Sequence, residues 1–357
     1  MTVGIEESTL RGLDWNSRFD ETSLTGLEVY PVGKAESVVR IPDGLIKSVG
    51  FVSRCEEKLD GEIGLAFGGT AFIVGVLVDA EAGIGLAHLV TAKHVAEAIE
   101  PGESVIAVNA RDGLPRFIRT GDQHWFYHPT EASTVDVAVL PFGSLNFDQY
   151  DIVWIPEDIF ATESRISEFN IGLGDEIFAI GLFTRFYGKD QLTPLVRSGS
   201  IAMMPKEAIP TSDFGDMEAY LVEGRSIGGL SGSPVFVRHT INMPAMSAQG
   251  KPATIHGLGR ELHLLGLMHG HWDVPVGFPA QERAEVVNMG VSIVVPAKKI
   301  LETLYHPELV RMRKEHIRKQ KNESRPVADS IFDRPLTKDE FEATLKKVSR
   351  KIRAIGK

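Results

Sequence analysis

Three short stretches of the chain carry side chains that together could perform nucleophilic chemistry. Ser231 lies among glycines and other small residues in SIGGLSGSPVF (residues 226–236). His94 follows a short strand-like run in LVTAKHVAEA, and Asp136 interrupts the apolar run of TVDVAVL. A serine hydroxyl is a weak nucleophile at neutral pH, so it requires a base, and the base requires an orienting group. These three residue types therefore indicate a serine nucleophile with a histidine base and an aspartate partner.

The glycines before Ser231 fit the same chemistry, because a tetrahedral intermediate needs hydrogen-bond donors for its negative oxygen. Gly229 has no side chain, so its peptide can adopt an orientation that other residues avoid. We expect its N–H and that of Ser231 to converge on one oxygen. Each motif alone also fits a structural role, as a strand-end histidine, a satisfied strand aspartate or a tight turn. Together they follow the chymotrypsin-type order His, Asp, Ser, with separations of 42 and 95 residues.

The elements that position these residues are predicted to be mainly β-strands. Short runs rich in Val, Ile and Leu alternate with Gly, Asp, Asn and Pro, as in strand-and-turn sequences. They form two clusters of about six or seven strands each. The predicted divisions are an N-terminal extension (1–37), a first barrel (38–150), a linker (151–170), a second barrel with a closing helix (171–305) and a basic helical tail (306–357).

The composition of the chain argues against some classes of function. The 357 residues carry a net charge of −10, although residues 301–357 have 15 Lys/Arg against nine Asp/Glu. An acidic body argues against nucleic-acid binding, while the basic tail either binds an acidic partner or is a solvated helix. The longest apolar run, TAFIVGVLV, is too short to span a membrane. A single cysteine and the lack of a secretory signal pattern at the N-terminus predict a cytoplasmic protein.

Taken together, the motifs resemble those of the trypsin-like (chymotrypsin-fold) serine peptidases of the bacterial Deg/HtrA-like type. GTAFIV with HLVTAKHV resembles the strand pair that leads to the base, DVAVL the acid strand and GGLSGSPVF the nucleophile loop. GDEIFAIG and LVRSGSIA resemble early strands of the second barrel, and GVSIVVPAKKILETL its last strand and closing helix. The resemblance covers about residues 38–305 and implies two six-stranded antiparallel Greek-key barrels followed by C-terminal helices.

The resemblance also implies roles for individual residues. His94 is expected to be the general base, Asp136 its orienting partner and Ser231 the nucleophile. The N–H groups of Gly229 and Ser231 are expected to form the oxyanion hole. Peptide bonds would be cleaved through an acyl-enzyme, with a polypeptide as substrate and no cofactor. By position, the substrate pocket would be lined by Arg225, His269, Gly270, His271 and Gly290.

Several features depart from the usual pattern. Leu230 stands where family members often carry a polar or acidic residue, so activation by an ion pair with a new N-terminus is not expected. Lys93 stands beside the base and is expected to point to solvent. No PDZ module like that of typical Deg/HtrA proteases is expected after the barrels, because residues 306–357 are too few to form one. The histidines His269 and His271 lack a firm third ligand, so no metal site is expected.

Two further functions fit the same sequence. A catalytically silent trypsin-like barrel could serve as a peptide-binding or scaffolding module. An assembly or nucleic-acid-binding protein could act through the basic tail, in which case its binding would weaken strongly with salt. The presence of all three catalytic residue types favours the peptidase. The sequence does not determine the oligomeric state.

Overall fold

A computed structural model of the chain describes most of its central part. The described residues are 41–57, 63–79, 84–99, 104–120, 123–142, 149–186, 188, 190–224, 228–238, 243–246, 252–255, 262–276 and 285–323. The predicted N-terminal extension and the part of the predicted tail after residue 323 lie outside them. The chain divides into two units, Met1–Val310 and Arg311–Lys357. All candidate site residues belong to the first unit.

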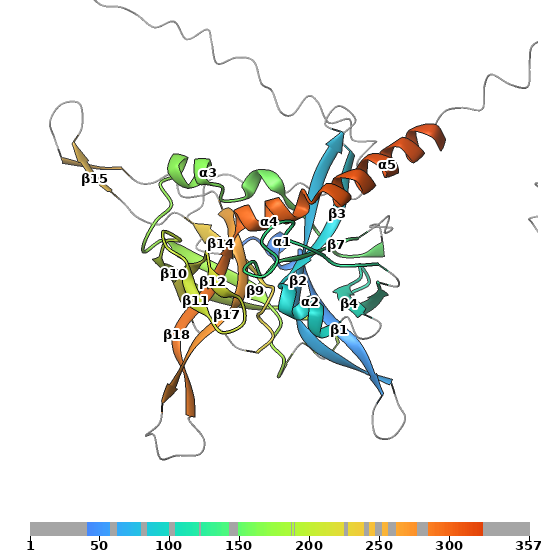
Figure 1. The fold of residues 1–357 in the computed structure, drawn as a ribbon, viewed down its shortest axis with the longest axis horizontal. Helices are drawn as coiled ribbons and strands as arrows, with labels where there is room; N and C mark the ends of the chain where they lie inside the picture. The colour runs from blue at the N-terminus through green and yellow to red at the C-terminus, as the bar shows by residue number, and fades with distance from the viewer. Residues whose placement is uncertain are drawn as a thin grey trace, which may run out of the picture. The chain divides into compact units, whose positions relative to one another are not determined.

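The first half of that unit contains one eight-stranded sheet (Figure 1). Its strand order is β5-β4-β1-β2-β3-β7-β6, and β8 pairs in parallel with β2. Runs of Val, Ile, Leu and Phe form the buried sides of these strands, as expected for β-branched and aromatic residues. The strands are β1 (Val49–Glu57), β2 (Ile63–Asp79), β3 (Ile84–Thr91), β4 (Ser104–Asn109), β5 (Pro115–Arg119), β6 (Phe126–Tyr127), β7 (Ala138–Pro141) and β8 (Ile155–Pro156).

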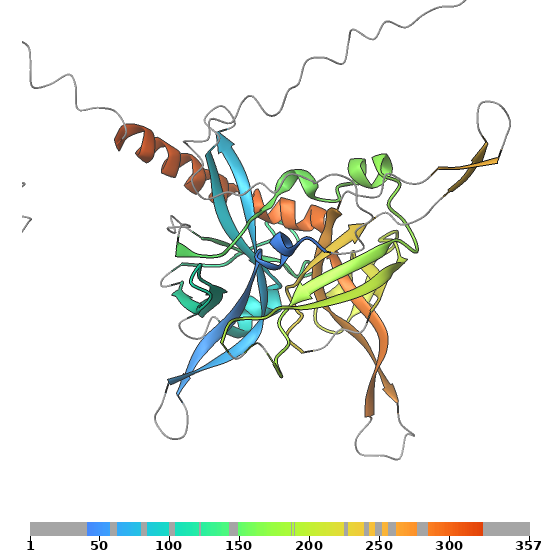
Figure 2. The same ribbon diagram turned by 180° about the vertical axis from the view of Figure 1, so that it is seen from behind.

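The second half contains a closed antiparallel barrel with the strand order β10-β13-β18-β17-β14-β9. Figure 2 shows this barrel from behind, with β10 in yellow-green and β18 in orange. Two short hairpins, β11–β12 and β15–β16, form separate sheets. The strands are β9 (Glu176–Gly181), β10 (Leu195–Met203), β11 (Ile209–Thr211), β12 (Gly215–Met217), β13 (Tyr220–Glu223), β14 (Pro234–Arg238), β15 (Met243–Met246), β16 (Pro252–Ile255), β17 (Leu262–Val276) and β18 (Glu285–Pro296).

The two halves share one strand order. The six main strands of the first half are β1, β2, β3, β4, β5 and β7. Numbered in chain order, they lie side by side in the order fifth, fourth, first, second, third and sixth. The six barrel strands of the second half are β9, β10, β13, β14, β17 and β18. Numbered in the same way, they follow one another around the closed barrel in the same cyclic order. In both halves the fourth strand returns beside the first, which is the Greek-key arrangement.

The predicted β-rich fold with few helices is confirmed, and so is one six-stranded barrel. The first half differs from the prediction, because its described pairings leave the sheet open between β5 and β7. The physical reason is that β7 pairs with β3 on one side and with the two-residue strand β6 on the other. The edge of β5 that would close a barrel has no partner strand among the described residues.

The described helices are short except the last, and they lie between the strands or after the last strand. They are α1 (Asp43–Ile46), α2 (Lys93–Ile99), α3 (Glu163–Glu168), α4 (Ala297–Leu304), α5 (Pro307–Glu323) and the 3₁₀ turn η3 (Glu157–Ile159). The segment predicted as a linker, 151–170, contacts both halves, since β8 pairs with β2 and Phe160 forms a bridge with Leu264 of β17. None of the described helices is long and apolar enough to cross a membrane.

One apolar core joins the two halves of the first unit. Leu89 and Val139 of the first sheet belong to the same cluster of buried side chains as Ile180 and Phe236 of the barrel. A second cluster fills the barrel itself. Because apolar burial is the main stabilising contribution in folding, this shared core holds residues from both halves at fixed positions.

Candidate active site

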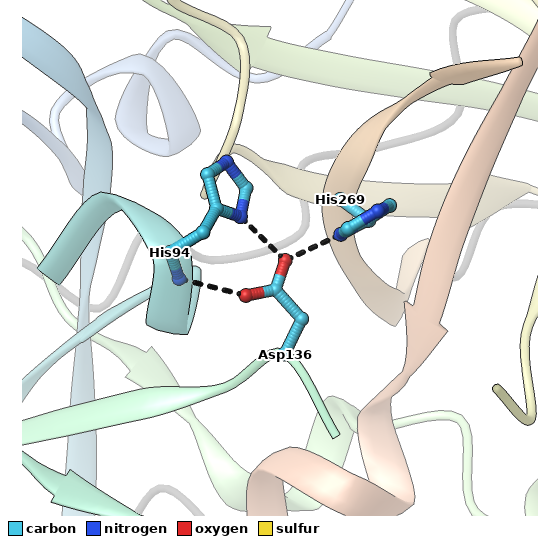
Figure 3. Close-up of side chains that lie close together, drawn as sticks. All are labelled: His94, Asp136 and His269. Atoms are coloured by element: carbon cyan, nitrogen blue, oxygen red, sulfur yellow. Dashed lines mark hydrogen bonds and ion pairs between the residues drawn. The ribbon is translucent and has the colours of Figure 1, made fainter. Parts of the chain in front are cut away.

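His94 and Asp136 are in direct contact, although 42 residues separate them in the chain (Figure 3). His94 lies in the first turn of α2, and its backbone N–H donates to Oδ1 of Asp136 at 2.9 Å. Its ring atom Nδ1 lies 2.8 Å from Oδ2 of the same carboxylate. Both oxygens therefore bind one residue, which fixes the orientation of the imidazole relative to the acid.

The segment that leads to Asp136 is anchored by α4. Lys299 of α4 is buried, and its Nζ lies 2.7 Å from Oε2 of Glu131. His128 is also buried, with Nε2 2.8 Å from Oε2 of Glu302.

Lys93 donates to the carbonyl of Ala132 at 2.6 Å, and its side chain is only 16% exposed. The expectation that Lys93 points to solvent was therefore wrong, because its ammonium group binds this backbone carbonyl.

His269 is a third member of the group, through a contact that the sequence analysis did not predict. It lies in β17, with its Nδ1 2.5 Å from Oδ2 of Asp136. Its ring meets that of His94 edge-on, with centroids 5.4 Å apart. One buried carboxylate oxygen thus faces two imidazole nitrogens. The local sequence marks His269 only as one of two nearby histidines, and it is the register of β17 in the folded barrel that places it beside Asp136.

These contacts alter the charge states of the group. Burial raises the pKa of Asp136, but the hydrogen bonds and positive charges of His269 and His94 outweigh it and hold this pKa well below its ordinary value. Burial lowers the pKa of His94, but the hydrogen bond and charge of Asp136 outweigh it, so that this pKa is raised. Asp136 is therefore ionised at neutral pH, and a neutral His94 carries its proton on Nδ1.

Ser231 lies beside this group, but its hydroxyl bonds to a backbone carbonyl and not to the imidazole of His94. Its Oγ donates to the backbone carbonyl of His269 at 3.0 Å. Among the described residues, Ser231 makes no hydrogen bond to the His94 ring. The structure therefore brings His94, Asp136 and His269 together and places Ser231 on the backbone of His269. Rotation about the Cα–Cβ bond moves a serine hydroxyl between three staggered positions, so its acceptor can change without a backbone movement.

Two glycines show how closely the loop around Ser231 packs against β2 and the start of α2. A Cβ atom built on Gly69 of β2 would lie 2.9 Å from the carbonyl of Ser231 and 2.9 Å from the side chain of Val95. One built on Gly232 would clash with the carbonyl of Thr70 and lie 3.0 Å from the backbone nitrogen of Ala92. The loop therefore lies against β2 and the start of α2 at distances that exclude a methyl group.

Gly232 provides a test of this packing. Gly232 and Gly113 both have φ of 82°, but an added Cβ meets no atom within 4 Å at Gly113. We expect Gly232→Ala to lower the free energy of unfolding by about 3 kcal/mol or more. Gly113→Ala carries only the backbone strain, about 1–2 kcal/mol. Denaturant unfolding of both variants measures the difference, and equal losses would contradict the packing described here.

The backbone before Ser231 offers two hydrogen-bond donors. The carbonyl of Gly228 accepts from Oγ1 of Thr184 at 3.1 Å, and the carbonyl of Leu230 accepts from N–H of Ser233 at 3.0 Å. In a trans peptide N–H points away from C=O, so the N–H groups of the following residues point away from those partners. Neither of these two N–H groups, of Gly229 and Ser231, has an acceptor among the described residues.

The other predicted pocket residues are only partly placed. Arg225 lies outside the described residues. Gly270 and Gly290 are half-buried and His271 is exposed. A Cβ atom built on either glycine would meet no described atom within 4 Å, so both border open space. The composition of a substrate pocket stays a prediction.

His94, Asp136 and His269 are also the residue types that bind transition metals. Their candidate ligand atoms all lie within 4.8 Å of one another. Ligand atoms around a tetrahedral zinc ion are about 3.3 Å apart when the bonds are about 2.0 Å. Here the two nitrogens lie only 2.8 and 2.5 Å from Oδ2 of Asp136. These distances are those of hydrogen bonds, which by themselves account for the grouping.

Comparison with known proteins gives similarity in structure only. No family model matches the chain, and no curated protein matches it. The crystal structure of Deg5 is similar with a TM-score of 0.41 and 16% identity, over 75% of this chain and 90% of that one. The MamO protease domain of Magnetospirillum magneticum, in its apo form, gives 0.42 and 15%, over 72% and 96%. At these TM-scores neither similarity carries an argument about the chemistry of the site. That chemistry has to be inferred from the residues of the site themselves.

Proposed function

We propose that the chain is a serine endopeptidase with two chymotrypsin-like β-domains, in which His94, Asp136 and Ser231 form the catalytic triad. The observation that carries the proposal is the doubly hydrogen-bonded contact between His94 and Asp136. It lies beside a loop in which the N–H groups of Gly229 and Ser231 have no acceptor among the described residues. The common strand order of the two halves supports the proposed two-domain arrangement. The substrate class is polypeptide, and the chemistry requires no cofactor.

The proposed mechanism begins with the base. Because the proton on Nδ1 of His94 is bound by the ionised Asp136, Nε2 carries the lone pair that can accept the proton of Ser231. The hydroxyl first leaves the carbonyl of His269 by rotation about the Cα–Cβ bond. Oγ then attacks the carbonyl carbon of the substrate peptide while its proton passes to Nε2.

The tetrahedral intermediate places a negative charge on the former carbonyl oxygen. The N–H groups of Gly229 and Ser231 are the donors proposed to bind it. His94 then gives its proton to the leaving amine, the C–N bond breaks and an acyl-enzyme remains on Ser231. A water molecule, deprotonated by His94, attacks the acyl group and releases the second product. Asp136 stays ionised throughout and stabilises the imidazolium.

A second candidate function is a silent barrel that binds peptides without cleaving them. The observation that favours it is the hydrogen bond from Ser231 to the carbonyl of His269, which leaves the hydroxyl away from the base. The two functions differ in one measurable property. A peptidase converts its peptides into new termini, whereas a binding module releases them unchanged.

A cleavage profile tests the proposed function. The wild-type chain and the Ser231→Ala variant are each incubated with a library of peptides derived from a whole proteome, and new termini are identified by mass spectrometry. We expect new termini with the wild type that are absent with the variant, and their flanking residues would define the preference of the substrate pocket. Identical profiles for the two proteins would contradict the peptidase.

The acid limb of the pH profile tests the role of His94. Only neutral His94 can accept a proton, so kcat/KM is expected to rise with pH through the pKa of this residue. Since the contact with Asp136 raises this pKa, the midpoint should lie above 6.5. Asp213→Asn removes another negative charge that raises it and should move the midpoint down. A midpoint below 6.5 in the wild type would contradict the assignment.

A further inference from the structure

Thr70 contacts both residues whose N–H groups form the proposed oxyanion hole. This residue of β2 is fully buried. Its hydroxyl donates to the carbonyl of Gly229 at 2.8 Å, and its backbone N–H donates to the carbonyl of Ser231 at 2.9 Å. One residue of the first sheet therefore fixes the carbonyl groups of both Gly229 and Ser231.

The hydroxyl of Thr70 also connects the loop to the barrel. It accepts the backbone N–H of Leu182, the residue after β9, at 2.8 Å. The carbonyl of Thr70 accepts the hydroxyl of Thr91 at 2.6 Å. Replacing the hydroxyl with a methyl group would leave the N–H of Leu182 and the carbonyl of Gly229 without these bonds. The hydroxyl thus joins β2, the end of β9 and the nucleophile loop at a single buried atom.

The loop needs such a restraint because its backbone is unusually free. Gly228, Gly229 and Gly232 all lie within five residues, and the last two have positive φ angles of 99° and 82°. Glycine adopts many backbone conformations, so a peptide here rotates easily when its carbonyl has no partner. Oxyanion stabilisation depends on donors that are already oriented before the reaction. The Gly229 carbonyl belongs to the peptide between Gly229 and Leu230, which lies between the two peptides that carry the N–H groups of Gly229 and Ser231. Loss of its bond to Thr70 should therefore free this central peptide and disorient the N–H group on either side of it.

We propose that Thr70 is a positioning residue that holds the N–H groups of Gly229 and Ser231 in the orientation that binds the oxyanion. Its catalytic meaning rests on the proposed peptidase function, whereas its effect on the loop does not. Thr70 acts through the loop, because its own donors are already bound to the two carbonyls. A merely structural role would affect stability alone and would leave turnover unchanged below the unfolding transition.

Three variants separate these roles. Thr70→Val removes the hydroxyl, Thr70→Ser keeps it, and Thr303→Val removes another fully buried hydroxyl, which bonds to the carbonyl of Lys299 in α4. We expect Thr70→Val to lower kcat by about 10- to 100-fold. KM and the pH midpoint should change little, since the base and acid are untouched. Thr70→Ser should stay within about threefold of the wild type, and Thr303→Val should keep its kcat.

A second measurement follows the loop without relying on activity. The amide signals of Gly229 and Ser231 are recorded by NMR in chains carrying ¹⁵N-glycine and ¹⁵N-serine. We expect both signals to shift in Thr70→Val and to stay in place in Thr303→Val. If the wild type hydrolyses no peptide, the proposed function fails and these signals alone decide the role of Thr70. Unchanged signals in Thr70→Val would overturn it, as would wild-type kcat for that variant in an active enzyme.

Discussion

Replacing Ser231 by alanine is expected to lower kcat for peptide hydrolysis by at least about 10⁴-fold, because no other group can form the acyl-enzyme. The fold should be retained, since the side chain makes one hydrogen bond, to the carbonyl of His269. Steady-state hydrolysis of a fluorogenic peptide found in the cleavage profile measures the change.

Ser233 provides a matched control in the same loop. Its side chain is buried, and its Oγ has no hydrogen-bond partner among the described residues. Ser233→Ala should therefore keep both wild-type turnover and wild-type stability, since it removes no described interaction. Loss of activity in both variants would point to a disturbed loop. Wild-type turnover in Ser231→Ala would contradict the assignment of the nucleophile.

Replacing Asp136 by asparagine is expected to lower kcat at neutral pH by about 10⁴-fold. The carboxylate accepts three contacts, from the backbone N–H of His94 and from Nδ1 of both His94 and His269. An amide has a single acceptor oxygen, so it cannot accept all of them. His94 then loses both its favoured tautomer and the charge that stabilises its protonated form. Kinetics at several pH values, with thermal unfolding, measures the effect.

Asp175 is the control for removing a buried carboxylate elsewhere. It is 1% exposed, and its Oδ2 accepts the N–H of Gly172 in the second half of the unit. Asp175→Asn should lower stability without a selective loss of turnover in the protein that remains folded. The role of Asp136 would be contradicted if its asparagine variant retained turnover within about tenfold of the wild type.

The contact between His94 and Asp136 was accessible from sequence for a physical reason. An aspartate in the apolar run before β7 must find a partner, because an unpaired buried charge is very costly. A histidine at the start of a helix after a strand is a well-anchored candidate for that partner. The structure places the two residues in contact, with Asp136 fully buried. Here local residue patterns and the requirement to satisfy a charge pointed to the same pair.

The other contacts of the site could not be predicted from local patterns. His269 reaches Asp136 only because the bulged register of β17 against β18 and β14 places it there. The acceptor of the Ser231 hydroxyl depends on a rotamer, which sequence does not specify. Thr70 belongs to a strand whose apolar run predicted no polar role. Each of these depends on tertiary contacts between residues more than 30 positions apart.

For the fold, too, local patterns predicted one part, and tertiary contacts decided the rest. Alternation of apolar runs and turn residues was sufficient to predict two groups of strands. It did not predict that β7 would pair with the two-residue strand β6, which leaves the first sheet open in its described pairings. Edge pairing is decided by the path of the connecting segments and by side-chain contacts across strands, so a sequence of short strands leaves it undetermined.

Covalent labelling with a fluorophosphonate tests whether Ser231 is an activated nucleophile, because this probe phosphonylates a serine activated by a base and an oxyanion hole. The labelled wild-type chain is digested, and the modified residue is identified by tandem mass spectrometry. We expect one adduct, located on Ser231, that is absent in Ser231→Ala and strongly reduced in Asp136→Asn. An unlabelled Ser231 in the folded wild-type chain, or labelling that persists in Ser231→Ala, would contradict it.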